Sequence, residues 1–178
     1  MRRFPISTLA GQLDAAVQHY EQVFQLRPEH AQAHNNFAIL LQRRGDWETA
    51  MRYAEEALRI QPDDPQAHYN YAILLEERGH EAEAENQYHS ALRLRPDYAE
   101  AHNNLAVIQQ RRGNRQQAEE HYIQTLRLRP NDPEAHYNYG LLLKARHESS
   151  QAARHFRIAY ELAPDVPAFR KAAQSEEV

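Results

Sequence analysis

The sequence predicts an all-α protein built from stacked repeats, and two patterns carry this prediction. Single residues return at a step of 34 positions, as the histidines His34, His68, His102 and His136 do. Between them, apolar residues are spaced as on one face of a helix, and no segment alternates with period two. A period in this range indicates a solenoid, in which each helix pair buries its apolar side on the next pair.

Each period predicts two helices joined by a tight turn. In the clearest copy, the first helix is expected over residues 66–78 and ends before Gly79. A glycine at this place takes the left-handed conformation that satisfies the last carbonyls of a helix. The second helix is expected over residues 81–95 and is stopped by Pro96, since proline lacks the N–H that continues a helix.

The sequence also marks where helices begin and where the array ends. The dipeptides Asp64-Pro65 and Asp132-Pro133 indicate an N-cap followed by proline at the first helical position. After Pro167 the segment AFRKAAQ predicts a short capping helix, which is followed by a loose acidic end.

Several positions depart from the pattern, and Gln109, His147 and Ala54 are among them. His147 stands where other copies carry a turn glycine, and we expect this turn to differ because a positive φ is costly for a residue with a side chain. Ala54 stands where other copies carry an aromatic residue, and we expect Trp47 and Tyr53 to fill the gap.

The residues at fixed phases resemble the tetratricopeptide repeat, a helix–turn–helix unit of 34 residues. In one copy the residues that carry the resemblance are Ala72, Gly79, Ala84, Tyr88, Ala91 and Pro96. The resemblance covers about residues 11–166 and implies a right-handed superhelical solenoid. It divides the chain into a partial unit with a second helix only, around Leu13–Leu26 (1–30), four complete units (31–64, 65–98, 99–132 and 133–166), and a capping helix with a tail (167–178).

Composition narrows the range of functions. The 178 residues have a net charge of −4 and include no cysteine, so we expect no nucleic-acid partner and no thiolate chemistry. No apolar run approaches the ~18 residues that indicate a spanning helix, so we expect no membrane insertion. No nucleophile or phosphate-loop pattern is present, and we therefore expect no enzymatic activity and no cofactor. The compartment stays undetermined, with a slight preference for the cytoplasm.

The histidine column is expected to pack between helices. Equivalent residues of stacked units lie about 10 Å apart, one helix-packing distance. Zinc ligands lie about 2.0–2.1 Å from the ion, so the residues of this column do not share a metal. We expect each histidine to donate one hydrogen bond inside the array, and we expect no metal site.

The asparagine column two residues later is the candidate binding element: Asn36, Asn70, Asn104 and Asn138. Two residues correspond to about 200° of helix rotation, so asparagine and histidine point to opposite sides. The column resembles the repeat arrays of O-linked N-acetylglucosamine transferases, and this resemblance implies an asparagine ladder that grips the backbone of an extended peptide. The alternative is that each asparagine hydrogen-bonds a neighbouring helix.

Neighbouring positions follow the same period. The residues before the asparagines are expected to face the groove, and they are Asn35, Tyr69, Asn103 and Tyr137. The residues after them, Phe37, Tyr71, Leu105 and Tyr139, are expected to pack inside. Further groove positions are expected near the end of each first helix: Arg43, Glu77 and Arg111, with Gln42, Glu76, Gln110 and Lys144 beside them.

Taken together, these patterns favour a non-enzymatic protein-interaction module that binds an extended peptide segment of a partner protein. Two alternatives stay open. The chain is a repeat region of a larger enzyme such as a glycosyltransferase, or it is a scaffold that self-associates through its incomplete first unit. Some proteins of the family that this chain resembles bind the C-terminal carboxylate of a chaperone with a lysine on the first helix. Here the corresponding positions hold asparagine or tyrosine, so we do not expect chaperone tails as ligands.

Overall fold

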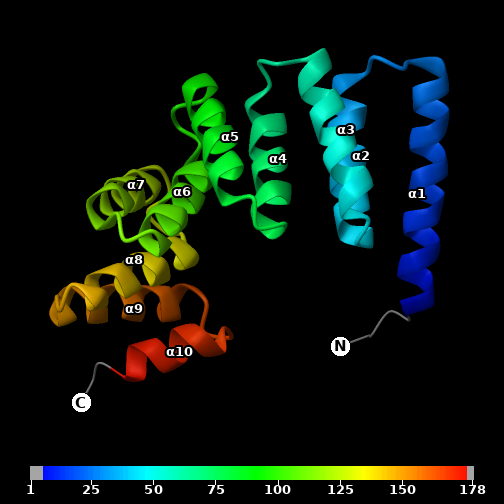
Figure 1. Ribbon diagram of the computed structural model, residues 1–178. Coiled ribbons are helices and arrows are strands. Elements are labelled where there is room, and N and C mark those ends of the chain that lie inside the picture. Colours follow the sequence, from blue (N-terminus) through cyan, green and yellow to red (C-terminus); the bar gives the residue numbers. More distant parts are fainter. Residues whose placement is uncertain (1–5, 176–178) are drawn as a thin grey trace. The chain divides into compact units, whose positions relative to one another are not determined.

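The computed structural model describes residues 6–175, with side chains described from residue 14 onward. Over this range the chain forms ten α-helices and no strand, which confirms the all-α prediction (Figure 1). The helices fall into two compact units, one ending at Arg95 and the other beginning at Pro96, and each is described by itself.

The N-terminal unit holds a single helix and two helix pairs. These are α1 (Ile6–Leu26), the pair α2 (Ala31–Arg44) and α3 (Trp47–Ile60), and the pair α4 (Pro65–Glu77) and α5 (Glu81–Leu94). The two helices of a pair lie side by side, and α4 packs on both helices of the pair before it. Ala50 and Ala84 are fully buried, and their small side chains let the paired helices approach closely.

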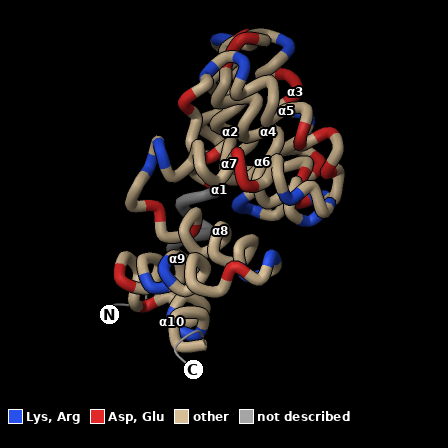
Figure 2. The backbone as a smooth tube through the Cα atoms, turned by 90° about the vertical axis from the view of Figure 1, so that its left-hand side faces the viewer, with Lys and Arg blue, Asp and Glu red and all other residues tan. Residues whose placement is uncertain are grey.

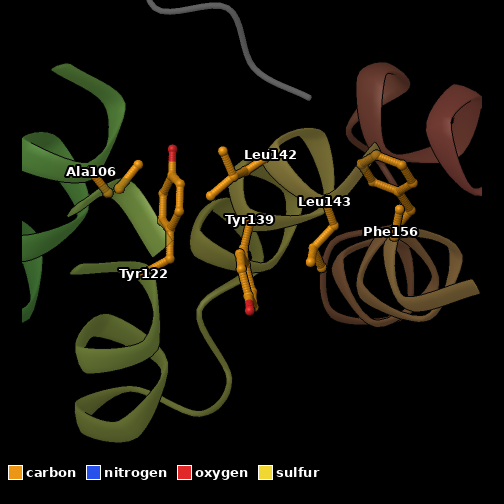
Figure 3. Packing of buried hydrophobic residues seen from close by; sticks show 8 residues of the cluster. Ala106, Tyr122, Tyr139, Leu142, Leu143 and Phe156 are labelled. Atoms are coloured by element: carbon orange, nitrogen blue, oxygen red, sulfur yellow. The ribbon is translucent and has the colours of Figure 1, made fainter. Parts of the chain in front are cut away.

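The C-terminal unit holds two helix pairs and a final short helix. These are α6 (Ala99–Arg111) with α7 (Arg115–Leu128), α8 (Pro133–Ala145) with α9 (Ser149–Leu162), and α10 (Pro167–Gln174). Figure 3 shows its core, which is built from Ala106, Tyr122, Tyr139, Leu142, Leu143 and Phe156. Phe169 is buried and fixes the capping helix α10 to the unit, as the sequence predicted for that segment.

The predicted helix starts and turns are present. The Asp64 carboxylate accepts a hydrogen bond from the backbone N–H of Gln66, and Asp132 accepts one from Ala135, so both are N-caps. Gly45, Gly79 and Gly113 adopt φ of 81–82°, the left-handed conformation that ends the first helix of each pair.

The expectation that the His147 turn differs is wrong. His147 adopts φ 63°, and its N–H donates to the Lys144 carbonyl as the N–H of Gly79 donates to the Glu76 carbonyl. The next N–H, of Glu148, closes the turn onto the Leu143 carbonyl at 3.0 Å. These hydrogen bonds hold the histidine in a conformation that its side chain disfavours.

The N-terminal end differs from the prediction in length. Helix α1 begins at Ile6 instead of near residue 13, and Gly11 lies inside it although it keeps the 34-residue step. The expected place of a preceding helix, before Phe4, and the acidic end after Ser175 lie outside the described residues. Tyr53, next to Ala54, packs with its ring 4.7 Å from that of Phe37, and the expected part of Trp47 stays a prediction.

Charged residues of both signs occur on each unit. Basic and acidic residues are interspersed along the helices of each unit (Figure 2). Among residues 6–175, no helix is both long enough and apolar enough to cross a bilayer.

Candidate peptide-binding surfaces

The histidine of each helix pair hydrogen-bonds to a proline carbonyl six residues earlier. The Nε2–oxygen distances are 2.7–3.1 Å, and the pairs are His34–Pro28, His68–Pro62, His102–Pro96 and His136–Pro130. A carbonyl only accepts, so Nε2 carries the hydrogen in every ring. The column therefore holds each proline turn against the helix that follows, which confirms the predicted packing role.

The other ring nitrogen meets different partners in the two units. In the N-terminal unit, Nδ1 of His68 lies 2.6 Å from Oε1 of Gln87. In the C-terminal unit it meets a second histidine 19 residues later, with Nδ1–Nδ1 distances of 2.9 Å for His102–His121 and 2.8 Å for His136–His155. Because Nε2 of the first ring carries its hydrogen, Nδ1 of that ring accepts the hydrogen bond when both rings are neutral.

The surroundings of these pairs favour the neutral imidazole for His102 and His155. Burial lowers the pKa of His102. Burial also lowers the pKa of His155 to about 4, and the neighbouring His136 and Arg154 add to the effect. Within the described part of the chain, no group of three or more potential metal ligands gathers at one point.

The asparagine column does not behave uniformly. Asn36 is exposed, and Asn104 and Asn138 are half-exposed on α6 and α8. Asn70 is only 8% exposed, and its amide nitrogen donates to the Asn35 oxygen at 3.0 Å, which joins α4 to α2. Its own oxygen accepts from Gln66 at 3.1 Å. Asn70 therefore supplies a bridge between helices, the alternative that the sequence left open, whereas Asn36 of the same unit does not.

The residues before the asparagines are more enclosed than a groove-facing column requires. Asn35 is 3% exposed because it lies in the bridge to Asn70. Tyr69 is half-buried against Tyr88, with ring centroids 5.8 Å apart. Asn103 is half-exposed, but its Oδ1 is buried and has no hydrogen-bond partner among the described residues.

Tyr137, the last member of this column, packs on two aromatic rings. Its ring centroid lies 5.8 Å from that of Phe156 and 4.9 Å from that of Phe169, so it joins α8 to α9 and α10. The ring is half-buried and so leaves part of its surface to solvent.

The residues after the asparagines pack inside, as predicted. Phe37, Tyr71, Leu105 and Tyr139 are at most 9% exposed. The hydroxyl of Tyr71 donates to Glu55, and that of Tyr139 donates to Glu119, so each ties its helix to the preceding pair of its own unit. Burial and the adjacent carboxylate raise the pKa of Tyr139 to about 12, which keeps this hydroxyl a donor at neutral pH.

Some of the polar residues near the ends of the first helices already form hydrogen bonds within the protein. Gln42 donates to Glu77 at 2.8 Å and joins α2 to α4. The hydroxyl of Tyr88 donates to Glu76, and that of Tyr122 donates to Gln110, within their own helix pairs. Arg43, Glu77 and Arg111 are exposed.

One column on the same helices was missed from the sequence. An aliphatic residue follows each asparagine by three positions, and the four are Ile39, Ile73, Val107 and Leu141. Residues three apart share a helix face. The first three are half-buried, and Leu141 is 37% exposed. Their shared 34-residue step was the signal that would have found them, but aliphatic residues were assigned to the core.

Comparison with known proteins agrees with this architecture. The family model described as tetratricopeptide repeat matches residues 8–69, 41–103 and 75–142. No curated protein sequence matches the chain.

Solved structures share the fold at low identity. The Cut9–Hcn1 hetero-tetramer of the APC/C has a TM-score of 0.83 at 17% identity, over 96% of this chain and 34% of that one. Pseudomonas aeruginosa PilF has a TM-score of 0.80 at 22% identity, over 95% and 83%. YrrB, described as a TPR protein with an unusual peptide-binding site, has a TM-score of 0.74 at 20% identity, over 88% and 81%. The helix pairs, the turns and the match to the family model establish that this chain belongs to the tetratricopeptide repeat family.

Proposed function

We propose that the protein is a non-catalytic interaction module that binds an extended segment of a partner protein along the first helices of its pairs. The observation that carries this proposal is the side-by-side placement of an amide and an aliphatic side chain on the solvent-accessible face of α8. There Asn138 is half-exposed and Leu141 is among the exposed large apolar residues. On α6, Asn104 and Val107 are both half-exposed.

This pairing suits a peptide in an extended conformation. A carboxamide offers one acceptor and two donors, which match the C=O and N–H of a peptide unit whatever its side chain. Neighbouring helices lie about 10 Å apart, and an extended chain rises about 3.3 Å per residue, so successive asparagines meet every third residue or so. The aliphatic column offers contact to the side chains of the bound segment.

The proposal assigns the strongest contacts to Asn104 and Asn138 on the surface of the C-terminal unit and, taken by itself, to Asn36 on the surface of the N-terminal unit. Asn70 and Asn35 have a smaller part, because they already hydrogen-bond each other. Each unit adds further residues around its own asparagines. These are Arg43, Tyr69 and Glu77 in the N-terminal unit, and Asn103, Arg111 and Tyr137 in the C-terminal unit. The backbone grip is the feature that the resemblance to O-linked N-acetylglucosamine transferase arrays implies, and YrrB is a relative in fold described as peptide-binding. No catalytic role is proposed.

The test is a peptide selection followed by matched variants. Peptides from a random displayed library are selected on the full chain and then titrated against Asn104→Ala/Asn138→Ala. We expect affinity to fall by about 1–3 kcal/mol for the pair, since each lost hydrogen bond is worth about 0.5–1.5 kcal/mol.

The control is Gln117→Ala/Gln151→Ala, which removes two exposed amides from the second helices α7 and α9. Equal affinity of the asparagine pair and the wild type would contradict the proposal, as would equal loss in the control.

A further inference from the structure

The C-terminal unit has a pocket of about 370 Å³ where α8, α9 and α10 meet. This volume lies within the range of about 300–1,000 Å³ that is typical of ligand pockets. Its apolar walls come from Tyr137 and Leu141 of α8 and from Phe156 of α9, and its charged residues are Lys144 of α8 and Lys171 of α10. No acidic side chain lines it among the described residues.

Sequence changes confined to this helix pair shape the pocket. In the two preceding pairs, a tyrosine hydroxyl donates to a polar residue near the end of the first helix: Tyr88 to Glu76, and Tyr122 to Gln110. At the equivalent positions the last pair has Phe156 and Lys144, so neither the hydroxyl nor its acceptor is present. The hydrogen bond that joins these positions in the two preceding pairs has no counterpart here, and an apolar ring and a cation line the pocket instead.

Gly140 also shapes the pocket, because it lets the Phe156 ring lie close to α8. The preceding pairs carry Ala72 and Ala106 at this position. A β-carbon on Gly140 would lie 2.7 Å from the Phe156 ring, so the ring sits closer to α8 than an alanine permits. Phe156 is 1% exposed and forms a fixed apolar floor, and Leu141 beside it is 37% exposed.

The pocket differs from the rest of the chain in the kind of cation that it carries. Lys144 and Lys171 are the lysines of the chain, and every other basic residue apart from histidine is arginine. An ammonium is a compact point charge on a flexible stem, which reaches a carboxylate from several directions. Two such groups on opposite helices of an apolar pocket complement a ligand with an apolar body and flanking negative charges.

We propose that this pocket receives a bulky apolar side chain flanked by aspartate or glutamate in the bound peptide segment. The proposal rests on the proposed function, because Tyr137 and Lys144 belong to the predicted groove positions and also line the pocket. It goes further by naming the chemical class of the segment: acidic on both sides of a leucine-sized or larger residue. The pocket gives the module a sequence preference, which the amide column by itself does not supply.

The lysines provide a direct probe. Reductive methylation of the full chain with ¹³C-formaldehyde labels Lys144, Lys171 and the terminal amine, and it keeps their charge. The NMR signals of the labelled methyl groups are assigned with the variants Lys144→Arg and Lys171→Arg, each of which lacks one signal. A short synthetic peptide with a central Glu-Leu-Glu triplet in a Gly-Ser background is then titrated, next to its Gln-Leu-Gln and Glu-Ala-Glu analogues. We expect the first peptide to shift both lysine signals saturably and each analogue to bind more weakly.

Matched variants separate local from general charge effects. Lys144→Gln/Lys171→Gln should weaken binding of the Glu-Leu-Glu peptide by about three- to tenfold, as expected for two partly solvated ion pairs. The control Arg127→Gln/Arg154→Gln removes the same charge from exposed positions of α7 and α9 and should leave binding within twofold.

The outcomes are distinguishable from failure of the proposed function. Unmoved lysine signals, or equal loss in both double variants, overturn the pocket even if selected peptides still depend on Asn104 and Asn138. Inorganic phosphate that shifts the signals as strongly as the peptide also overturns it and leaves an anion site only. Lysine shifts that persist in Asn104→Ala/Asn138→Ala support the pocket and count against the asparagine grip.

Discussion

In the N-terminal unit, Asn70 is buried and hydrogen-bonds Asn35 across two helices, whereas in the C-terminal unit Asn138 is half-exposed beside Leu141. The histidine columns differ in the same way, with His68 facing Gln87 and His136 facing His155. The 34-residue period thus sets where a side chain lies, and the residue on the neighbouring helix decides what it does. Variants at equivalent positions of the two units therefore measure how far the units are alike.

The largest expected effect concerns a feature that the units share. Ala84 and Ala118 are both fully buried where paired helices cross. Ala84→Leu and Ala118→Leu should each lower the free energy of unfolding by about 1–3 kcal/mol, because a well-packed crossing has no room for three more carbons. Denaturant titration of both variants checks this. A large loss for one variant and none for the other would show that the two crossings are not equivalent.

The second effect is a difference between the two units in how their stability depends on pH. His155 has a pKa of about 4 in the folded state, below its ordinary value of ~6.5, so the unfolded chain binds the extra proton first. Stability from this group is complete above pH ~6.5 and is lost as pH falls toward 4. We expect a loss of about 1–2 kcal/mol, reduced from the full shift because the ring is half-exposed.

Amide hydrogen exchange measures this loss locally. Protection should fall in α8 and α9 between pH 7 and 5, beyond any change in α4 and α5. The matched control His155→Gln copies Gln87 of the N-terminal unit and should flatten the pH dependence. An unchanged pH response in that variant would refute the role of the His136–His155 pair.

The smallest effect concerns the turns. His147 adopts φ 63° where Gly79 adopts φ 81°, and only glycine takes this region without cost. His147→Gly should raise the free energy of unfolding by about 0.5–1 kcal/mol, and Gly79→His should lower it by a similar amount. Nothing lies within 4 Å of a β-carbon built on Gly79, so the cost there comes from the backbone alone. Thermal and denaturant unfolding of both variants measure these changes, and a change of the opposite sign in either variant would contradict the prediction.

The fold followed from the sequence because its signals are local. Asp64 and Asp132 cap helices as predicted, and the glycine turns lie where the period places them. His147 escaped prediction because the closing hydrogen bonds of the turn outweigh the preference of one residue. Helix α1 runs through Gly11 because a residue's phase in the period does not itself require a turn.

The site was less predictable because it depends on contacts between helices. The repeat spacing places Asn70 and Asn138 identically, and only the presence of Asn35 on α2 explains why Asn70 is buried. The partners His121 and His155 lie 19 residues after their column histidines, a spacing that recurs but that links two different helices. The pocket beside Lys144 depends on α10 as well, so no single repeat encodes it.

We propose that the equivalent residues Asn70 and Asn138 differ in role: Asn70 holds the fold of its own unit, and Asn138 contacts the bound peptide. The most direct test measures the free energy of unfolding and the affinity for a selected peptide in Asn70→Ala and Asn138→Ala. Asn70→Ala should cost about 1–3 kcal/mol of stability, because Asn35 is left buried with its hydrogen-bonding group unpaired. Asn138→Ala should change stability by about 0.5 kcal/mol or less, as a surface substitution does, and should weaken peptide binding more than Asn70→Ala. Equal stability losses and equal affinities in the two variants would contradict the account.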